Sequence, residues 1–356
     1  MVRYIDRTRY RKSYRDVVDF YRRFVKNYPY APSHPLFGLN FGEQEPSTAP
    51  AITSIDLDLG DTSGGELRTL TGTGFTGATS VTVGGTAATA FYDISDTELI
   101  VVMPAHVAAT SQSILVTTPG GTNAANTLYE FWSPAELALT GFWDKGNYQD
   151  TTAGTWPGRT SAGASGGRDL TQASATNQPA EVGLAPDFDG VNDYQSGPVL
   201  STLFGAGSGF VVLLFLSRTA PADGGTTAPY TRPVLCDPGG TGLQVGFTDA
   251  GIRAGCYDGS TWDSVVQPAA TNALHLAAFR WDGTTQGLSV DGAAFSTSLQ
   301  GVPAHTGGLL RLGADYTLLA YATVAVAMVA TADVALSDAN ATKFLKWARA
   351  CRGLAA

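Results

Sequence analysis

Short runs of alternating apolar and polar residues dominate the chain between Ala51 and Trp132. The runs are bounded mostly by Gly, Pro or Asp, and they read AITSIDLDLG, GGELRTLTGTGF, SVTVGG, ELIVVMP, SILVTTPGG and LYEFW. A period of two is typical of strands with one buried face, and closely spaced short strands are typical of a β-sandwich. The pattern predicts a β-sandwich over residues 51–132.

A larger β unit is predicted from residue 136 to residue 356. Its apolar runs include GFVVLLFLSR, LHLAAFRWDGTTQGLSVDGAAF and YATVAVAMVA, and several are joined by Asp-Gly turns, a strong hairpin signal. The uncharged run from Tyr316 to Thr331 is slightly too short to span a membrane, and its β-branched and small residues suit a buried strand better. The pattern predicts a jelly-roll sandwich, so the protein is expected to be mainly β.

The C-terminus changes to a helical pattern. Ser337 is a suitable N-cap, and Gly353 stands where a C-cap glycine is expected. Apolar residues form one stripe between these two positions, namely Ala341, Phe344, Leu345 and Ala348. We predict a short helix that closes the second sandwich.

The first thirty residues carry a different period. Apolar residues recur at steps of four and three, at Tyr10, Tyr14, Val17, Tyr21, Phe24 and Tyr28, and basic residues fill the positions between them. This predicts an amphipathic helix over residues 1–30, followed by a proline-rich extended arm over residues 31–50. Such a helix needs a surface to pack on: its own β domains, other copies of itself, or a partner protein, which we favour.

Charge separates this segment from the rest of the chain. Residues 1–30 hold nine Lys or Arg and three Asp, a net charge of +6, whereas the whole chain carries -9. The acidic remainder opposes nucleic-acid binding, and a stripe rich in Tyr rather than Leu opposes a membrane-surface role. Neither nucleic acid nor membrane is therefore expected as a partner. The start shows no apolar run after a basic stretch, so we expect synthesis in the cytoplasm without a secretion signal.

The three cysteines, Cys236, Cys256 and Cys351, are too few and too widely spaced for a disulfide framework or a zinc knuckle. We interpret them as buried small hydrophobic residues. His106, alone among histidines in residues 51–132, has no nearby Cys or His that would make it a metal ligand.

The stretch from Ala51 to Trp132 resembles the IPT/TIG family of immunoglobulin-like domains. The resemblance depends on ITSI at Ile52, GGELRTLTGTGF, VTVGG at Val81, MPA at Met103 and TPGGTNAANTLYEF. Gly72 and Gly74 are expected to allow a turn with positive φ, so that Phe75 folds back into the core. The resemblance implies a spacer or binding module without chemistry.

The stretch from residue 136 to residue 356 resembles the laminin-G-like, concanavalin A-like lectin and glucanase superfamily. The resemblance depends on GRDLTQASATNQPAEVGLAPDFDGVNDY, FRWDGTTQGLSVDG and ALSDANATKFLKWARACRG. It implies binding of glycans or proteins, sometimes with calcium, or cleavage of glycans. Glucanases of this fold use paired glutamates, but Glu181 is the single glutamate after Glu136, and His275 and His305 lie in no GxSxG-type context. We therefore expect no catalytic residues and no enzyme activity.

The sequence DFDGVNDY, from Asp187 to Tyr194, has two interpretations. In the first it is a turn: Phe188 and Tyr194 pack, Gly190 takes a left-handed conformation, and Asp189 and Asn192 bond their own backbone. In the second it is a calcium site formed by oxygen atoms of Asp187, Asp189, Asn192 and Asp193. We favour the turn, because one short cluster seldom supplies all the ligands that calcium needs.

The segment CYDGSTWDS holds the candidate glycan-binding residues, Tyr257, Asp258, Trp262 and Asp263. An aromatic side chain beside carboxylates is typical of surfaces that stack on sugar rings, and the alternative is a polar loop with one half-buried Trp.

The order of the segments resembles that of a tailed-bacteriophage virion surface protein: an N-terminal anchor, an arm, an Ig-like module and a lectin-like domain. This arrangement implies a protein on the tail, the baseplate or the capsid, with other virion proteins and a host-surface glycan as partners. The heptad-like stripe suits a homo-oligomer such as a trimer. Two alternatives stay open: a structural virion protein that binds no sugar, and an adhesin on a bacterial cell surface.

Overall fold

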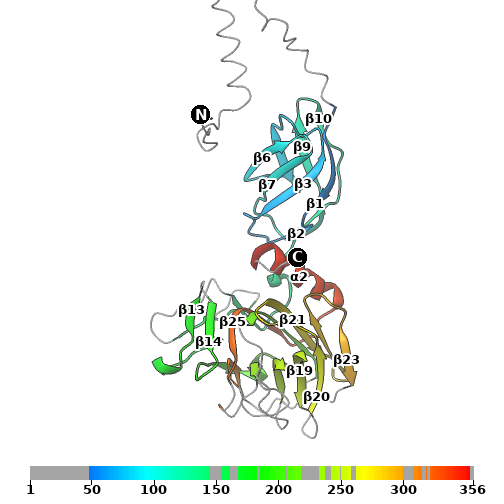
Figure 1. Cartoon of the computed structure of the whole chain (residues 1–356). Helices are drawn as coiled ribbons and strands as arrows, with labels where there is room; N and C mark the ends of the chain where they lie inside the picture. Colours follow the sequence, from blue (N-terminus) through cyan, green and yellow to red (C-terminus); the bar gives the residue numbers. More distant parts are fainter. Residues whose placement is uncertain are drawn as a thin grey trace, which may run out of the picture. The chain divides into compact units, whose positions relative to one another are not determined.

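The computed structural model (Figure 1) describes a set of residues that begins at Thr48 and ends at Arg352. These residues are 48–144, 154–160, 167–182, 185–204, 207–217, 232–236, 242–248, 250–257, 262–299, 308–314, 318 and 321–352. The predicted anchor helix, with its stripe from Tyr10 to Tyr28, lies outside the described residues, as do residues 31–47 of the predicted arm.

The first sandwich is built from three small sheets of short strands, and the short strands agree with the short alternating runs. The strands, in the order in which they pair, are β1 (Ala51–Ile55), β3 (Leu67–Thr73), β7 (Glu98–Val102) and β6 (Ala90–Ser95); β10 (Gly121–Thr122), β9 (Ile114–Thr118), β4 (Ser80–Val83) and β5 (Thr86–Ala87); and β2 (Leu59–Gly60), β11 (Tyr129–Phe131) and β8 (Ala109–Gln112). Leu70, Leu99, Val101 and Val116 face the shared core, because residues two apart on a strand point to the same side.

The turn after β3 differs from the expectation at one of its two glycines. Gly74 has the predicted positive φ of 74°, and Phe75 is fully buried. Gly72 is not among the residues with positive φ; it lies inside β3, where an added Cβ would meet the Ala51 carbonyl oxygen at 2.0 Å. Close approach of the neighbouring strand, rather than a turn, therefore explains Gly72.

The second sandwich has two antiparallel sheets, which confirms the predicted jelly-roll type of architecture. The larger sheet runs β13 (Ala180–Val182), β14 (Ala185–Asp189), β25 (Thr323–Ala332), β16 (Gly209–Ser217), β21 (Leu274–Trp281), β22 (Thr285–Val290) and β23 (Ser296–Leu299), and β12 (Gly141–Asp144) also pairs with β25. The smaller sheet runs β15 (Gln195–Val199), β24 (Leu309–Leu312), β17 (Arg232–Cys236), β18 (Leu243–Thr248), β19 (Gly251–Tyr257) and β20 (Trp262–Gln267).

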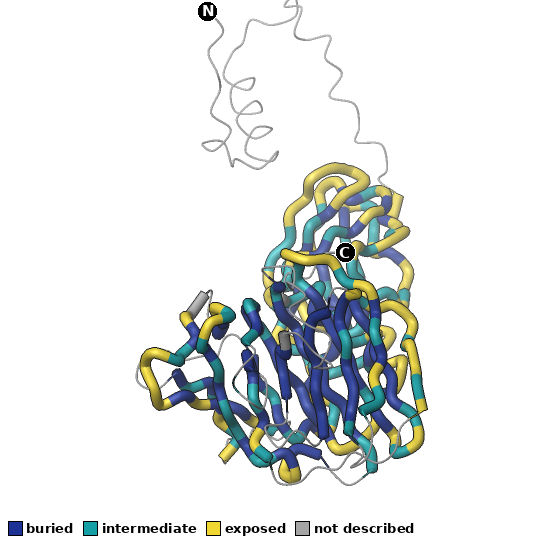
Figure 2. Tube along the Cα trace, turned by 60° about the horizontal axis from the view of Figure 1, so that its bottom comes forward, coloured by how far each residue is buried: buried dark blue, intermediate teal, exposed yellow. Residues whose placement is uncertain are grey.

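Strand β16 is apolar on both faces, and Figure 2 shows a group of deeply buried strands in this sandwich. Val211, Leu213 and Phe215 enter the core between the two sheets. Phe210, Val212 and Leu214 enter a second core on the opposite face of the larger sheet. Burial on both faces explains the continuous apolar run GFVVLLFLS, and the uncharged stretch ending at Thr331 is a strand from Thr323 onward, in β25.

The C-terminal helix α2 (Asp338–Arg352) covers that second core. Ser337 caps it as predicted, because its Oγ accepts a hydrogen bond from the Asn340 N–H at 3.2 Å. All four residues of the predicted stripe are buried, and Phe344 packs edge-on against Trp132 at 5.2 Å. Gly353 lies outside the described residues.

Helix α2 also binds the first sandwich through charged groups. Lys343 Nζ lies 2.6 Å from Glu130 Oε1, and Lys346 Nζ lies 2.6 Å from Asp58 Oδ2. The described residues of both sandwiches belong to one compact unit, Thr48–Ala356. One helix therefore contributes to the packing of both sandwiches.

Two expectations about single residues can be compared with the structure. Cys236 and Cys256 are buried free thiols, but Cys351 is only half-buried, because it lies near the end of α2. His106 packs flat on the Phe131 ring, with centroids 4.7 Å apart, and its Nδ1 lies 2.7 Å from the Val107 carbonyl oxygen.

In the part of the chain that the structure describes, no helix is long and apolar enough to cross a membrane.

Candidate functional site

The aromatic pair Tyr257 and Trp262 lies at the end of the β19–β20 hairpin. The two residues are cross-strand partners, and their ring centroids are 5.6 Å apart with the ring planes inclined by 37°. Both side chains are half-buried. Cross-strand aromatic pairs of this kind fix each other's orientation and form a rigid apolar platform.

The two candidate carboxylates do not both lie beside this platform. Asp258 lies outside the described residues. Asp263 pairs with Cys256, whose side chain belongs to the core between the sheets, so Asp263 is on the opposite side of its strand from Trp262. Asp263 directly follows Trp262 in the sequence. Successive side chains of a strand point to opposite faces, however, so Asp263 does not lie on the face of the aromatic pair.

Other polar residues share the outer face of the smaller sheet with the aromatic pair. Arg253 alternates with the core residues Ile252 and Ala254, and it therefore points away from the core like Tyr257. Gln244 pairs with Gly255 on the adjacent strand and lies on the same face, but it is only 5% exposed. An aromatic platform beside a partly exposed arginine has the composition of a surface that binds polar ligands.

A second aromatic group lies at the other end of the same sheet. Arg311 lies between the buried Leu310 and Leu312, so it faces outward, and its guanidinium carbon is 5.3 Å from the centroid of the Tyr194 ring. This cation–π contact was missed in the sequence, although the alternation of LLRL around one charged residue could have revealed which way Arg311 points.

The DFDGVNDY segment is a turn that connects the two sheets of the second sandwich. Strand β14 before it belongs to the larger sheet, and β15 after it belongs to the smaller one. Asp189 forms the predicted turn, since its Oδ1 accepts hydrogen bonds from the Val191 N–H at 2.7 Å and the Asn192 N–H at 3.3 Å. Gly190 has a φ of 79°, and Phe188 is fully buried, both as predicted.

Asn192 acts differently from the expectation. Its side-chain amide donates to the Thr176 carbonyl oxygen at 2.8 Å, so it connects the turn to a segment sixteen residues earlier rather than to its own backbone. Asp193 Oδ2 accepts the Asp189 N–H at 3.1 Å, which closes the turn from the other side. Each of these groups therefore has a structural partner inside the protein.

The electrostatics of the turn are unusual at Asp193. Burial raises the pKa of the Asp193 carboxyl group to about 6, the hydrogen bond from Asp189 N–H lowers it in part, and the nearby charges of Asp189 and Asp187 raise it further. Across the described residues, no group of three or more His, Cys, Asp or Glu side chains is placed to hold a metal ion. The calcium interpretation therefore gains no support from the geometry of this turn.

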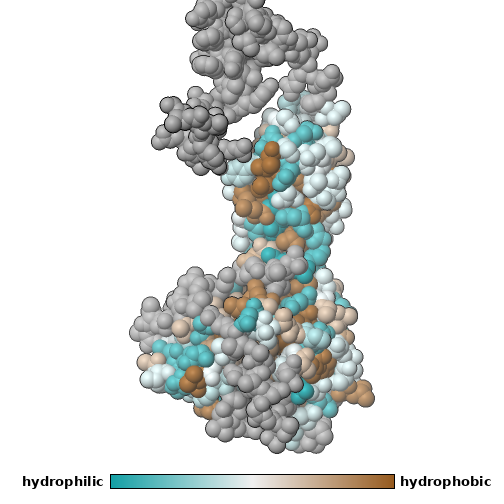
Figure 3. Space-filling model, viewed as in Figure 1, coloured by the Kyte–Doolittle hydropathy of each residue, from teal (hydrophilic) through white to brown (hydrophobic). Residues whose placement is uncertain are grey.

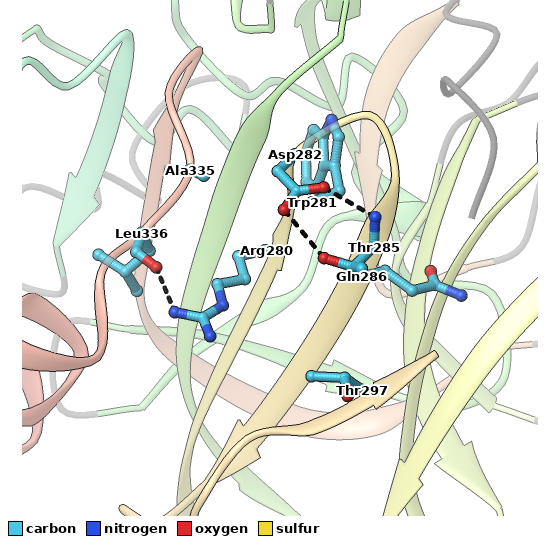
Figure 4. A pocket seen from close by; sticks show the side chains of 8 residues that line it. All are labelled: Arg280, Trp281, Asp282, Thr285, Gln286, Thr297, Ala335 and Leu336. Atoms are coloured by element: carbon cyan, nitrogen blue, oxygen red, sulfur yellow. Dashed lines mark hydrogen bonds between the residues drawn. The ribbon is translucent and has the colours of Figure 1, made fainter. Parts of the chain in front are cut away.

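A small pocket of about 160 Å³ lies where the β21–β22 hairpin meets the start of α2 (Figure 4). Arg280 donates to the Leu336 carbonyl oxygen at 2.7 Å, pairs with Asp338, and lies over the Phe295 ring at 3.8 Å. Asp282 accepts hydrogen bonds from Thr284 and Thr285, which hold the pKa of its carboxyl group well below the usual range. The charged groups of this pocket are thus engaged in holding α2 and the hairpin, and we assign the pocket a structural role.

Comparison with known proteins identifies the first sandwich. Residues 50–131 match the IPT/TIG domain. This confirms the resemblance found in the sequence for that segment. No curated protein matches the chain.

Solved structures resemble the chain at a distance. A sialidase of Trypanosoma rangeli in complex with 2,3-difluoro-KDN is 14% identical, with a TM-score of 0.43 over 64% of this chain and 34% of that chain. The botulinum neurotoxin serotype D binding domain is 9% identical, with a TM-score of 0.42 over 59% of this chain and 50% of that one. The match thus spans about a third of the sialidase and half of the toxin domain. A likeness this distant carries no argument about activity.

Proposed function

We propose that this protein is a virion surface protein of a tailed bacteriophage whose second sandwich binds a glycan on the host surface. The observation that supports the glycan proposal best is the Tyr257–Trp262 pair, with its ring centroids 5.6 Å apart on the outer face of the smaller sheet. Sugar rings present flat faces of C–H groups, and aromatic rings stack on them. The IPT/TIG module and the basic N-terminal segment suit a protein that is attached at one end and presents a binding domain at the other.

The arginine beside the platform suits a hydroxyl-rich ligand. Arg253 lies on the same outward face and is partly exposed, and a guanidinium group donates hydrogen bonds to hydroxyl and carboxylate oxygens. A weak, multivalent interaction is expected, because the platform consists of only two rings and several copies on one particle would add avidity.

The glycan proposal is tested with the full chain on a glycan array and in a host-cell pull-down, each run with calcium and with a chelator. We expect saturable binding, and we expect Trp262→Ala to weaken it at least about tenfold, which corresponds to about 1.4 kcal/mol. Leu299→Ala is the matched control, because Leu299 is 81% exposed on β23 of the other sheet. Absence of binding, or equal binding by both variants, would rule out the platform as the receptor site.

A purely structural role is the second candidate. It is favoured by the contacts of α2, which packs on the larger sheet and also forms ion pairs with Glu130 and Asp58 of the first sandwich. A helix that ties two sandwiches together suits a spacer or a stabilising protein. A chain that incorporates into particles but binds no glycan would support this role.

The location is tested separately. Antibodies against the second sandwich should label purified phage particles from the strain that encodes the chain, and deletion of residues 1–30 should remove the label. Labelling of intact bacterial cells in the absence of particles would favour a cell-surface adhesin instead.

A further inference from the structure

An exposed apolar face lies on the first sandwich, on the side of the β1–β3–β7–β6 sheet that points away from its core. Leu67, Tyr92 and Ile94 are 59%, 42% and 53% exposed. Figure 3 shows hydrophobic surface over the region where Figure 1 labels β6 and β7. Single exposed apolar residues are ordinary, but a contiguous group on one sheet face marks an interaction surface.

The strand register makes this group contiguous. Val102 pairs with Leu67 on one side and with Ala90 on the other, and Ile100 pairs with Tyr92. These residues form two adjacent rows across three strands, because directly paired residues point to the same face. Core residues such as Leu70, Leu99 and Val101 occupy the alternate positions and point the other way.

The edge of this face carries an acidic residue. Glu98 lies on the same face as Ile100, two residues away on β7, whereas Asp93 pairs with the core residue Leu99 and therefore points to the other face. Residues 51–132 hold eight acidic residues and one basic residue, a net charge of -7. The basic one, Arg68, is buried, with its guanidinium bound to the Leu67 and Leu59 carbonyl oxygens. The occupant should therefore be basic as well as apolar.

We propose that this face binds residues 1–30 of a second copy of this chain. The segment carries a net charge of +6 and repeats aromatic residues at steps of four and three, which complements an apolar face that has Glu98 at its edge and belongs to an acidic sandwich. Contact between two identical faces is disfavoured, because it would bring together two sandwiches that each carry a net charge of -7. The inference rests on the proposed docking role of residues 1–30 and names the surface that receives them.

Chain length permits the exchange between copies. Residues 31–50 join the segment to β1, and twenty residues extend at most about 70 Å. A head-to-tail contact, in which each copy gives its segment to the next, closes into a ring such as the expected trimer.

The test uses the full chain with a photo-reactive benzoylphenylalanine at Tyr14 or Tyr21. Isotope-labelled and ordinary chains are mixed, irradiated, and mapped by mass spectrometry. We expect crosslinks between labelled and ordinary chains that end within residues 67–73 or 90–102. The double variant Leu67→Lys, Ile94→Lys should reduce their yield at least about tenfold, whereas Leu299→Lys in the second sandwich should not.

Circular dichroism and thermal unfolding of each variant verify that the fold is intact. Crosslinks confined to single chains, crosslinks to the second sandwich, absence of crosslinks, or equal yields from a folded double variant and its control would each overturn the proposal. Incorporation into particles is measured for the same variants. For the chain without the lysine substitutions, absence of crosslinks between copies with retained incorporation refutes the exchange alone, and crosslinks between copies without particle association refute the virion role alone.

Discussion

His275 and Asp291 form an ion pair at the edge of the second sandwich, with the His275 Nδ1 atom 2.7 Å from Asp291 Oδ2. The other ring nitrogen, Nε2, lies 2.7 Å from the Ala270 carbonyl oxygen. A carbonyl and an ionised carboxylate only accept hydrogen bonds, so both ring nitrogens must donate, and the folded protein favours the imidazolium form. The pair connects the start of β21 to the turn after β22, where Asp291 also accepts the Leu276 N–H at 2.9 Å.

Because of this pair, the free energy of unfolding should depend on pH above the usual pKa of histidine. Burial lowers the pKa of the His275 ring, but the hydrogen bonds to Asp291 and Ala270 and the charge of Asp291 together raise it above its usual 6.5. A raised pKa means that the stabilisation is fully present below about pH 6.5 and is lost as the pH rises through the pKa of the folded state.

We therefore expect the contribution of His275 to the free energy of unfolding to fall as the pH rises above about 6.5. His275→Gln should cost about 1–3 kcal/mol at pH 6 and less at pH 9. Urea unfolding at several pH values measures both quantities. A cost for His275→Gln that is the same at every pH would contradict the imidazolium assignment.

Asp193 predicts a separate effect in the acidic range. Its carboxyl pKa is raised from 3.8 to about 6, so the folded state prefers the protonated form. The Asp193 carboxyl group therefore contributes fully to the free energy of unfolding below about pH 3.8. This contribution is lost as the pH rises to about 6.

Asp193→Asn removes this ionisation, and the side-chain oxygen of Asn can still accept the Asp189 N–H. The unfolding free energy of the variant minus that of the native protein should increase from pH 4 to pH 6 and then become constant. Thermal or urea unfolding from pH 4 to pH 8 determines the difference. A difference that does not change over this range would show that the burial of Asp193 has little effect on its ionisation.

The sequence was sufficient for the fold where local patterns and packing agree. Asp-Gly turns marked the hairpin after β21, and the apolar run of β16 marked a fully buried strand. Ser337 marked the start of α2, because a cap depends only on its own neighbours along the chain.

The sequence was insufficient where partners are distant in the chain. Asn192 bonds Thr176, and Arg311 lies over Tyr194, and neither contact has a signature in the local spacing. For Asp263 the sequence was misleading in another way. Asp263 and Trp262 are neighbours in the sequence, but their side chains point to opposite faces of β20. The exposed apolar face around Ile100 also could not be predicted from the sequence. It depends on which residues of β3, β7 and β6 pair with one another, and the pattern of a single strand does not reveal this pairing.

A comparison of Gly190 with Gly85 separates two costs of replacing a glycine by alanine: the strain of a positive φ and the steric clash of the added methyl group. Gly190 and Gly85 have almost the same φ, 79° and 80°. A Cβ added at Gly190 would lie 2.2 Å from Thr323 Oγ1, whereas one added at Gly85 would meet nothing within 4 Å.

Gly85→Ala should therefore cost only the left-handed backbone strain, about 1–2 kcal/mol. Gly190→Ala should cost more, because Thr323 or the turn must also move. Urea unfolding of the two variants gives the comparison, and equal costs would show that the turn relaxes around the added methyl group.

Trp347 offers the sharpest test of the contact between α2 and the first sandwich. Its indole N–H donates to Asp61 Oδ2 at 2.5 Å, and its ring is buried in the second core of the second sandwich. Trp347→Phe keeps an aromatic ring but removes the donor, so we expect a loss of about 1.5–3 kcal/mol for a hydrogen bond to a charged group. Lys346→Ala removes an ion pair that is largely exposed to solvent, and it should cost at most about 1 kcal/mol.

A double-mutant cycle of Trp347→Phe with Asp61→Asn isolates the pair from changes in ring packing. We expect a coupling energy above about 0.5 kcal/mol, measured by urea unfolding of the four proteins. Trp347→Phe with Asp58→Asn is the matched control, because Asp58 pairs with Lys346 on the same helix. Zero coupling in the Trp347–Asp61 cycle would show that this hydrogen bond contributes nothing to stability.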